Sequence, residues 1–209
     1  MLLIQLFLTL HMLVYLSMVK KLGPESKILV HGASTAVSNS FVQIAKRHLK
    51  VGTVVDVCNS NSLEYNKTAG YNFLFSYNQL NLSKKIQDFI KYDMKAEKFD
   101  MIFDSVGTLQ YYPIIHDIMK LRKENSYYVS IAGNKKADYN AGLKGALQEF
   151  PFKNVILSRN PLRSYNYAHP MIQPTAEYAA FLEDNVSKKQ IIPALDSVYN
   201  IKDFQKAID

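Results

Sequence analysis

The chain has 209 residues, 48% of them hydrophobic, with 25 Lys and Arg against 18 Asp and Glu and a net charge of +7. At roughly 100–200 residues per domain, this length accommodates one complete domain and part of a second. The single cysteine excludes an internal disulfide and a multi-cysteine zinc site, and the five histidines lack an HExxH spacing, so we expect no metal. The cations are dispersed rather than gathered into a tract with interleaved aromatic residues, so we expect no nucleic-acid partner.

The first segment, residues 1–22, begins with an apolar stretch over residues 1–19 that contains no charged side chain. A helix of about 20 apolar residues can span a bilayer. Polar side chains such as Gln5 and His11 would be costly in hydrocarbon, which favours a helix buried between two lobes of a globular protein. Both interpretations stay open, and under the first of them residues 1–19 contact a lipid surface.

From residue 23 onward, short apolar runs alternate with amphipathic stretches. The pattern predicts strands over 27–30, 53–57, 73–75, 99–103 and 127–131, and helices over 36–49, 63–69, 83–91 and 111–121. Strands separated by helices of this length specify an α/β fold, a Rossmann-type parallel sheet with helices on both faces. We assign residues 23–150 to this domain and residues 151–209 to its remainder and an incomplete C-terminal remnant of a catalytic lobe.

Ligands of open α/β sheets bind beyond the carboxyl ends of the strands. The loops 31–38, 58–61, 104–108 and 132–134 follow four of the predicted strands, so we expect them to line one rim of the sheet. Clusters of cations at Lys46-Arg47 and Arg122-Lys123 fall instead at the ends of predicted helices, where they meet the negative end of the helix dipole.

The loop after the first strand has the small residues that a phosphate site needs. Gly32 lets the backbone approach an anion, Ser34 and Thr35 add hydroxyl donors, and Ala36 opens a helix whose N–H groups and dipole favour negative charge. With one glycine and no GxGxxG, an ordinary strand-to-helix turn is an equally good interpretation of these residues alone.

The loop after the second strand would face the adenosine ribose of a bound dinucleotide. An acidic residue in this loop would favour NAD, whereas Asn59, Ser60 and Asn61 are neutral. Lys67 follows closely enough to balance a 2′-phosphate, although it could equally be a solvated helix residue. The loop therefore favours NADP(H) weakly.

Several runs together resemble the cofactor domain of zinc-free, quinone-oxidoreductase-like medium-chain dehydrogenase/reductases. These runs are "LGPESKILVHGAST", "VQIAK", "NSLEYNKTAGYNFLFSY", "KFDMIFDSVG" and "YYVSIAG", which occur in the family's order and spacing. The later runs "SRNPLRSYNYAHP" and "IIPALDSVYNIKDFQKAID" are similar to a fungal, Yim-type branch of that family.

The resemblance implies an NADPH-dependent reductase, in which a GroES-like barrel and a Rossmann domain enclose the substrate cleft. It places Ser34, Thr35, Ala36 and Val37 at the pyrophosphate. Ser60 and Lys67 would lie near the adenosine phosphate, and Val106, Gly107 and Gly133 near the nicotinamide. It supplies no catalytic residue, substrate or metal. It also implies a location at lipid droplets or in mitochondria, whereas the residues without this resemblance would suggest the cytoplasm. The formation of a homo-oligomer stays open.

Two departures bear on activity. The family usually has glycine where this chain has Ser38, and a side chain there would push the helix outward or need a local partner. The GroES-like barrel would precede Met1 and is therefore expected to be missing, as is the last part of the catalytic lobe. The first hypothesis is an NADP(H)-binding oxidoreductase-like protein that lacks half of its cleft. The alternatives are a non-catalytic protein of lipid-droplet or membrane surfaces and an inactive, truncated gene product.

Overall fold

A computed structural model describes residues 22–132, 162–170, 176–192 and 198–207, together with residues 152 and 156. The apolar segment 1–19, Gly133 and the rest of the loop 133–134 lie outside the described residues. Within these described ranges, no helix is both long and apolar enough to cross a membrane.

The centre of the molecule is a six-stranded sheet in the order β3-β2-β1-β4-β5-β6. Its strands are β1 (Lys27–His31), β2 (Thr53–Cys58), β3 (Phe73–Ser76), β4 (Met101–Asp104), β5 (Tyr127–Ser130) and β6 (Asn166–Ala168). Every neighbouring pair is parallel. The strand order reverses at β1, which lies between β2 and β4, and this reversal point is where doubly wound sheets bind ligands. The predicted Rossmann-type fold is therefore confirmed.

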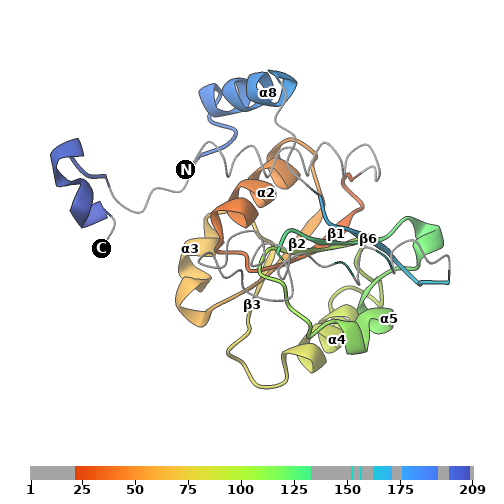
Figure 1. Ribbon diagram of the computed structural model, residues 1–209. Coiled ribbons are helices and arrows are strands. Elements are labelled where there is room, and N and C mark those ends of the chain that lie inside the picture. Colours follow the sequence, from red (N-terminus) through yellow and green to blue (C-terminus); the bar gives the residue numbers. More distant parts are fainter. Residues whose placement is uncertain are drawn as a thin grey trace.

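The strands lie where the apolar runs predicted them because both faces of the sheet are covered (Figure 1). On one face lie α2 (Ala36–Arg47), α3 (Leu63–Lys67) and α8 (Ala176–Ser187), and on the other lie α4 (Leu82–Tyr92) and α5 (Ile115–Ile118). Short 3₁₀ helices occur at Ser60–Ser62, Tyr112–Ile114, Arg122–Glu124 and Ile201–Ala207. Two apolar cores result, one on each face of the sheet. A strand buried on both faces has no need of alternating polar residues.

Helix α2 is buried more completely than the sequence predicted. Its N-cap is Thr35, whose side chain accepts a hydrogen bond from the Ser38 N–H, and its last turn holds Lys46 and Arg47 as expected. The predicted apolar face contacts the sheet, but polar residues on the other face, including Asn39 and Gln43, are buried as well. The segment around α8 contributes to this burial, because Gln43 forms two hydrogen bonds with the Ile192 backbone and Leu182 of α8 belongs to the same core as α2.

The helix predicted over residues 111–121 is wrong in length. A 3₁₀ turn over Tyr112–Ile114 leads into α5, which ends at Ile118. Met119 is extended and pairs with Phe99 in an isolated parallel bridge. This pairing with Phe99, which lies just before β4, therefore ends the helix before its apolar pattern stops. Arg122 and Lys123 consequently lie in a separate 3₁₀ turn rather than at the end of that helix.

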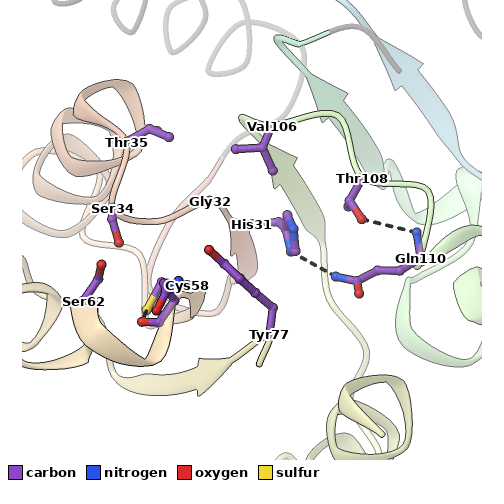
Figure 2. A pocket seen from close by; sticks show the side chains of 11 residues that line it. His31, Gly32, Ser34, Thr35, Cys58, Ser62, Tyr77, Val106, Thr108 and Gln110 are labelled. Carbon is purple, nitrogen blue, oxygen red and sulfur yellow. Dashed lines mark hydrogen bonds between the residues drawn. The ribbon is translucent and has the colours of Figure 1, made fainter. Parts of the chain in front are cut away.

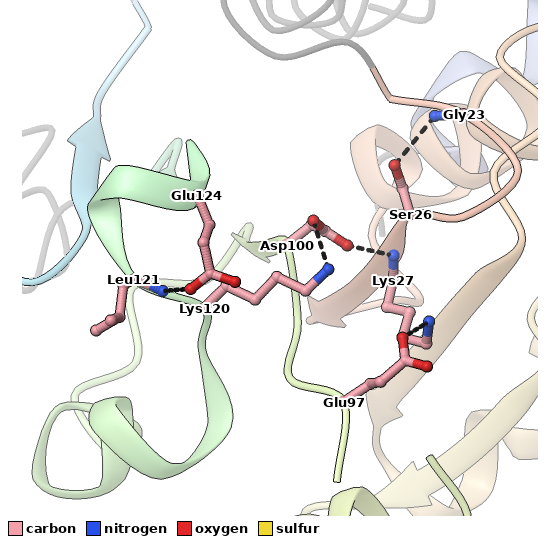
Figure 3. A network of polar contacts seen from close by, with 8 residues as sticks. All are labelled: Gly23, Ser26, Lys27, Glu97, Asp100, Lys120, Leu121 and Glu124. Carbon is pink, nitrogen blue, oxygen red and sulfur yellow. Dashed lines mark hydrogen bonds and ion pairs between the residues drawn. The ribbon is translucent and has the colours of Figure 1, made fainter. Parts of the chain in front are cut away.

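A polar network joins the amino ends of the strands (Figure 3). The Asp100 carboxylate accepts a hydrogen bond from the Lys27 N–H at 2.9 Å and pairs with the Lys120 ammonium at 3.1 Å. Lys27 also pairs through its side chain with Glu97. Since Asp100 is only 7% exposed, its charge is compensated within the protein rather than by water.

Candidate functional site

A cavity of about 470 Å³ opens at the carboxyl edge of the sheet, where the strand order reverses (Figure 2). Its lining comes from the loops after β1, β2 and β4 and from the residue after β3: His31, Gly32, Ser34, Thr35, Cys58, Asn59, Ser62, Tyr77, Val106, Thr108 and Gln110. This volume is typical of sites for small molecules and cofactors. Three of the four loops predicted to form one rim, those after β1, β2 and β4, thus meet as expected.

The turn after β1 brings backbone and hydroxyl groups to the cavity. Gly32 has φ +80°, a conformation that favours glycine, and a Cβ there would lie 2.5 Å from the Ser105 hydroxyl and 2.6 Å from Val106. The turn closes through a hydrogen bond from the Thr35 N–H to the Gly32 carbonyl at 3.0 Å, and α2 begins directly after it. A helix N-terminus at the wall of a cavity favours an anionic ligand.

Ser38 finds the local partner that its position requires. Its hydroxyl lies 3.0 Å from the Ser105 hydroxyl and 3.1 Å from that of Thr35, and the residue is fully buried. Ser105 in turn lies 3.0 Å from the carbonyl oxygens of His31 and Gly32. The hydroxyl cluster of Thr35, Ser38 and Ser105 therefore ties the start of α2 to the loop after β4.

Asn66 fixes the polar floor beneath the turn. Its amide nitrogen donates to Asp56 Oδ2 at 2.9 Å and to Ser34 Oγ at 3.1 Å, and both Asn66 and Asp56 are fully buried. Burial raises the pKa of Asp56 to about 6, and hydrogen bonds from Cys58 and Asn66 offset part of that shift. Burial, together with the nearby Asp56, raises the pKa of Cys58 to about 12, so this thiol stays protonated.

The orientation of Ser34 follows from this floor. The Asn66 amide occupies one acceptor position of the Ser34 hydroxyl, which keeps its own proton for donation to another acceptor. Figure 2 shows the hydroxyl ends of Ser34 and Ser62 directed toward one another across the cavity wall. Ser34 is thus prepared as a hydrogen-bond donor beside the helix N-terminus.

His31 forms part of the opposite wall. Its Nδ1 lies 2.7 Å from the Tyr111 hydroxyl and 3.2 Å from Gln110 Nε2. Burial lowers the pKa of His31 to about 4, so the imidazole is neutral at physiological pH. With Cys58 protonated as well, the residues that line the cavity bear no formal charge at neutral pH.

Asp104, the last residue of β4, holds the loop that follows this strand. Its carboxylate accepts hydrogen bonds from the N–H groups of Val106, Gly107 and Thr108 at 3.1, 2.9 and 2.8 Å. The Tyr128 hydroxyl donates to the same carboxylate at 2.9 Å. Burial raises the pKa of Asp104, and these four donors oppose that effect. Val106 and Gly107 are therefore fixed in place by a buried side chain.

The predicted site residues fall into groups. Gly32, Ser34, Thr35 and Val106 line the cavity. Gly107 adjoins them, and Ala36 and Val37 form the start of α2. Ser60 begins the 3₁₀ turn between Asn59 and Ser62 without lining the cavity itself.

Lys67, Tyr165 and Tyr167 do not line the cavity. Lys67 is paired with Glu64 at 2.5 Å on the exposed side of α3. Tyr165 and Tyr167 are buried, with the Arg163 guanidinium over their rings, so packing explains them.

Several lining residues carried no sequence signal of their own. Tyr77 and Gln110 lie outside the predicted rim loops. His31 and Thr108 lie within two of these loops, but no motif distinguishes them from their neighbours. The rule that strand ends meet at one edge could have included Tyr77, which directly follows β3. In the described ranges, no three His, Cys, Asp or Glu side chains come together in a way that could hold a metal ion.

Solved structures share this fold. A mycobacterial quinone oxidoreductase superposes with a TM-score of 0.67 at 17% identity, over 97% of this chain and 57% of that one. Escherichia coli quinone oxidoreductase, in a complex with NADPH, superposes with a TM-score of 0.60 at 18% identity, over 95% of this chain and 58% of that one. The chain thus shares its Rossmann-type fold with these proteins over a little more than half of their length.

Its sequence relatives are more specific. The chain is 42% identical to protein YIM1-2 of Lachancea thermotolerans, over 91% of this chain and 52% of that protein. It is 37% identical to protein YIM1 of Saccharomyces cerevisiae, over 88% of this chain and 50% of that protein. No family model matches the sequence. The chain is thus similar in sequence to fungal YIM1 proteins, and it spans about half the length of the curated relatives it matches.

Proposed function

We propose that the chain binds NADP(H) and that it serves as the cofactor-binding part of an oxidoreductase related to the quinone oxidoreductases. The observation that carries this proposal is the cavity at the strand-order reversal, where the Gly32 turn and the N-terminus of α2 form one wall. A cavity in this position is the usual dinucleotide site of such sheets. The complex of the E. coli quinone oxidoreductase with NADPH supports the choice of cofactor.

The residues present suit each part of the cofactor. The pyrophosphate would rest against the Ser34 hydroxyl, the Gly32 turn and the first N–H groups of α2, because these donors face an otherwise uncharged cavity. The adenosine ribose would lie against Asn59 and Ser62, with Ser60 beside them. The nicotinamide side would be bounded by the loop of Val106 and Gly107, with Gly133 a further expected contact.

The nicotinamide ring, when bound, supplies the hydride that a reductase transfers. The protein contributes binding and orientation, and the Asp104-anchored loop is the rigid element next to the ring side. Turnover also requires a substrate held against that ring in a cleft from which water is excluded. Binding is accordingly the property that we propose for the chain alone, and hydride transfer is the activity that we propose for the whole protein.

Fluorescence titration of the full 209-residue chain with NADPH tests the proposal. We expect saturable binding by the wild type and its loss in Gly32→Ala, since a Cβ at Gly32 would collide with Ser105 and Val106 in a backbone conformation that favours glycine. Gly23→Ala is the matched control, because a Cβ at that position meets nothing within 4 Å. Circular dichroism checks that both variants fold. If the folded wild type shows no saturable signal, the proposal is wrong.

A further inference from the structure

The cavity is lined by a buried histidine of which one ring nitrogen is not engaged by the described residues. His31 is only 6% exposed, and its Nδ1 is engaged by Tyr111 and Gln110. Its other ring nitrogen, Nε2, has no hydrogen-bond partner among the described residues, and it is not among the fully buried polar atoms. A histidine placed in this way offers one ring nitrogen to whatever occupies the cavity.

The partners of Nδ1 determine where the imidazole proton lies. The amide nitrogen of Gln110, 3.2 Å away, can only donate a hydrogen bond. The Tyr111 hydroxyl, 2.7 Å away, keeps its proton because burial raises its pKa well above the ordinary value, so it is able to donate to an Nδ1 that already faces the Gln110 donor. Two donors facing Nδ1 make that atom an acceptor. A neutral ring with an accepting Nδ1 carries its proton on Nε2.

The neighbours of His31 suit a flat heterocycle rather than a phosphate. The Tyr77 ring extends across the cavity from the end of β3, with its centroid 6.3 Å from that of His31 (Figure 2). Tyr77 is 46% exposed and offers an aromatic face on which a nucleic-acid base can stack. The phosphate-binding features, in contrast, lie at the Gly32 turn and the start of α2. A neutral donor beside an aromatic face matches an uncharged acceptor.

We propose that this part of the cavity holds the adenine of the bound nucleotide and that the His31 Nε2–H donates a hydrogen bond to one of its ring nitrogens. His31 would thereby be a base-binding residue, held in the correct tautomer by Tyr111 and Gln110. Adenine offers N1, N3 and N7 as uncharged acceptors. The inference rests on the proposed function, since it assigns the base of the nucleotide that the site would bind.

The test follows the imidazole nitrogens of the full chain by NMR, with histidine labelled by ¹⁵N. Titration with AMP is compared with titration by ribose 5-phosphate, which has the sugar and phosphate but lacks the base. We expect the His31 proton on Nε2 in the free protein, and a saturable shift of the Nε2 resonance with AMP but not with ribose 5-phosphate. The His31 signal is assigned by its loss in His31→Phe or His31→Asn.

Affinity measurements give an independent readout. His31→Phe keeps an aromatic ring of similar size but removes the donor, so we expect a three- to tenfold loss of AMP affinity, about the value of one neutral hydrogen bond. Tyr111→Phe keeps the imidazole and removes only one partner of Nδ1, so we expect a smaller loss and a mixture of tautomers.

Different failures point to different errors. A proton on Nδ1, or an Nε2 resonance that stays fixed while AMP shifts other resonances to saturation, overturns the assignment of His31 and leaves nucleotide binding intact. Failure of both AMP and NADPH to bind the folded wild type overturns the proposed function and this inference together. Because the NMR titration uses the wild type, the test stands even if the variants at His31 do not fold.

Discussion

At the residue scale, the floor of the cavity shows how buried polar groups prepare a site before any ligand arrives. The Asn66 amide joins the Asp56 carboxylate to the Ser34 hydroxyl, so one side chain both compensates a buried acid and orients a donor. Ionised Asp56 is costly because burial removes it from water and no described residue places a cation beside it, as its raised pKa reflects. Stability and pH are therefore coupled at this position.

Asp56→Asn should change how stability depends on pH. The folded-state pKa of Asp56, about 6, lies above that of the unfolded chain, so the folded protein binds the extra proton between about pH 4 and 6. Asp56 therefore makes its full contribution to the free energy of unfolding below pH 4, and this contribution is lost as the pH rises through 6. Relative to the wild type, Asp56→Asn should gain on the order of 2–3 kcal/mol of unfolding free energy between pH 4 and pH 7.5.

Urea denaturation of both proteins across this range measures the difference. The comparison is necessary because His31, with its pKa lowered to about 4, acts in the opposite direction and loses stability as the pH falls from about 6.5. The two effects therefore oppose each other in the wild type, whose free energy of unfolding then changes little with pH. A difference between variant and wild type that does not change with pH would contradict the assignment to Asp56.

Cofactor preference is also decided by single residues. Lys67 is the cation that the sequence assigned to the 2′-phosphate of NADP(H), but it is paired with Glu64 at 2.5 Å on an exposed surface. Glu64→Gln should release it, so the ratio of NADPH to NADH affinity should rise about two- to threefold, since exposed ion pairs are weak. Parallel fluorescence titrations measure the ratio, and Lys84→Gln, on the distant α4, is the control. An unchanged ratio would place Lys67 outside the site.

At the element scale, α2 has two partners: the sheet beneath it and the segment around α8 above it. The Gln43 side chain donates to the Ile192 carbonyl at 2.9 Å and accepts from the Ile192 N–H at 2.8 Å. The His48 ring packs edge-on against Phe181 with centroids 5.0 Å apart. The second half of α2 is thus fixed from both sides.

Gln43→Met should loosen the segment around α8 while leaving the sheet intact. The substitution keeps the length of the side chain but removes both hydrogen bonds to Ile192, so we expect a loss of about 1–3 kcal/mol of unfolding free energy. Hydrogen exchange of the amides in α8 should accelerate more than that in β1. Glu183→Gln, an exposed change on α8 itself, should leave the exchange unaltered. Equal acceleration in both elements would show that α8 is not a separate unit.

The sequence predicted these elements unevenly. The strands and α2 were predicted because their apolar runs face cores on both sides of a sheet, and a buried run is visible without knowledge of its neighbours. The end of α5 was not predicted, because Met119 leaves the helix to pair with Phe99, which is distant in sequence. The polar burial of α2 was missed for the same reason, since Gln43 is paired with Ile192, which is distant in sequence.

At the scale of the whole molecule, the two edges of the sheet have separate tasks. The carboxyl edge holds the cavity, and the amino edge holds the network of Asp100, Lys27 and Lys120 (Figure 3). Strands β1 and β4 separate these two edges by their full length. We therefore expect a substitution in the network to alter the stability of the fold but not the geometry of the cavity.

Asp100→Ala should therefore lower stability without changing nucleotide affinity. The variant leaves the Lys27 N–H and the Lys120 ammonium without this buried acceptor, at a cost of about 1–3 kcal/mol. Glu97→Gln removes only the partly exposed pair with Lys27 and should cost less stability than Asp100→Ala. Thermal denaturation ranks the variants, and NADPH titration well below their melting temperatures tests the site. Weaker binding by folded Asp100→Ala would show that the two edges are coupled.

The sequence by itself determined the layered α/β fold and the three rim loops at the strand ends, because periodic burial and turn residues are local properties of the chain. Only the tertiary structure decided which side chains form the cavity. His31, Tyr77 and Gln110 meet through strands that are neighbours in the sheet but distant in sequence. It also decided that Ser38 is accommodated by Ser105 and that Lys67 faces Glu64. Hydrogen bonds and ion pairs depend on distances of a few ångströms, which residue order alone does not specify.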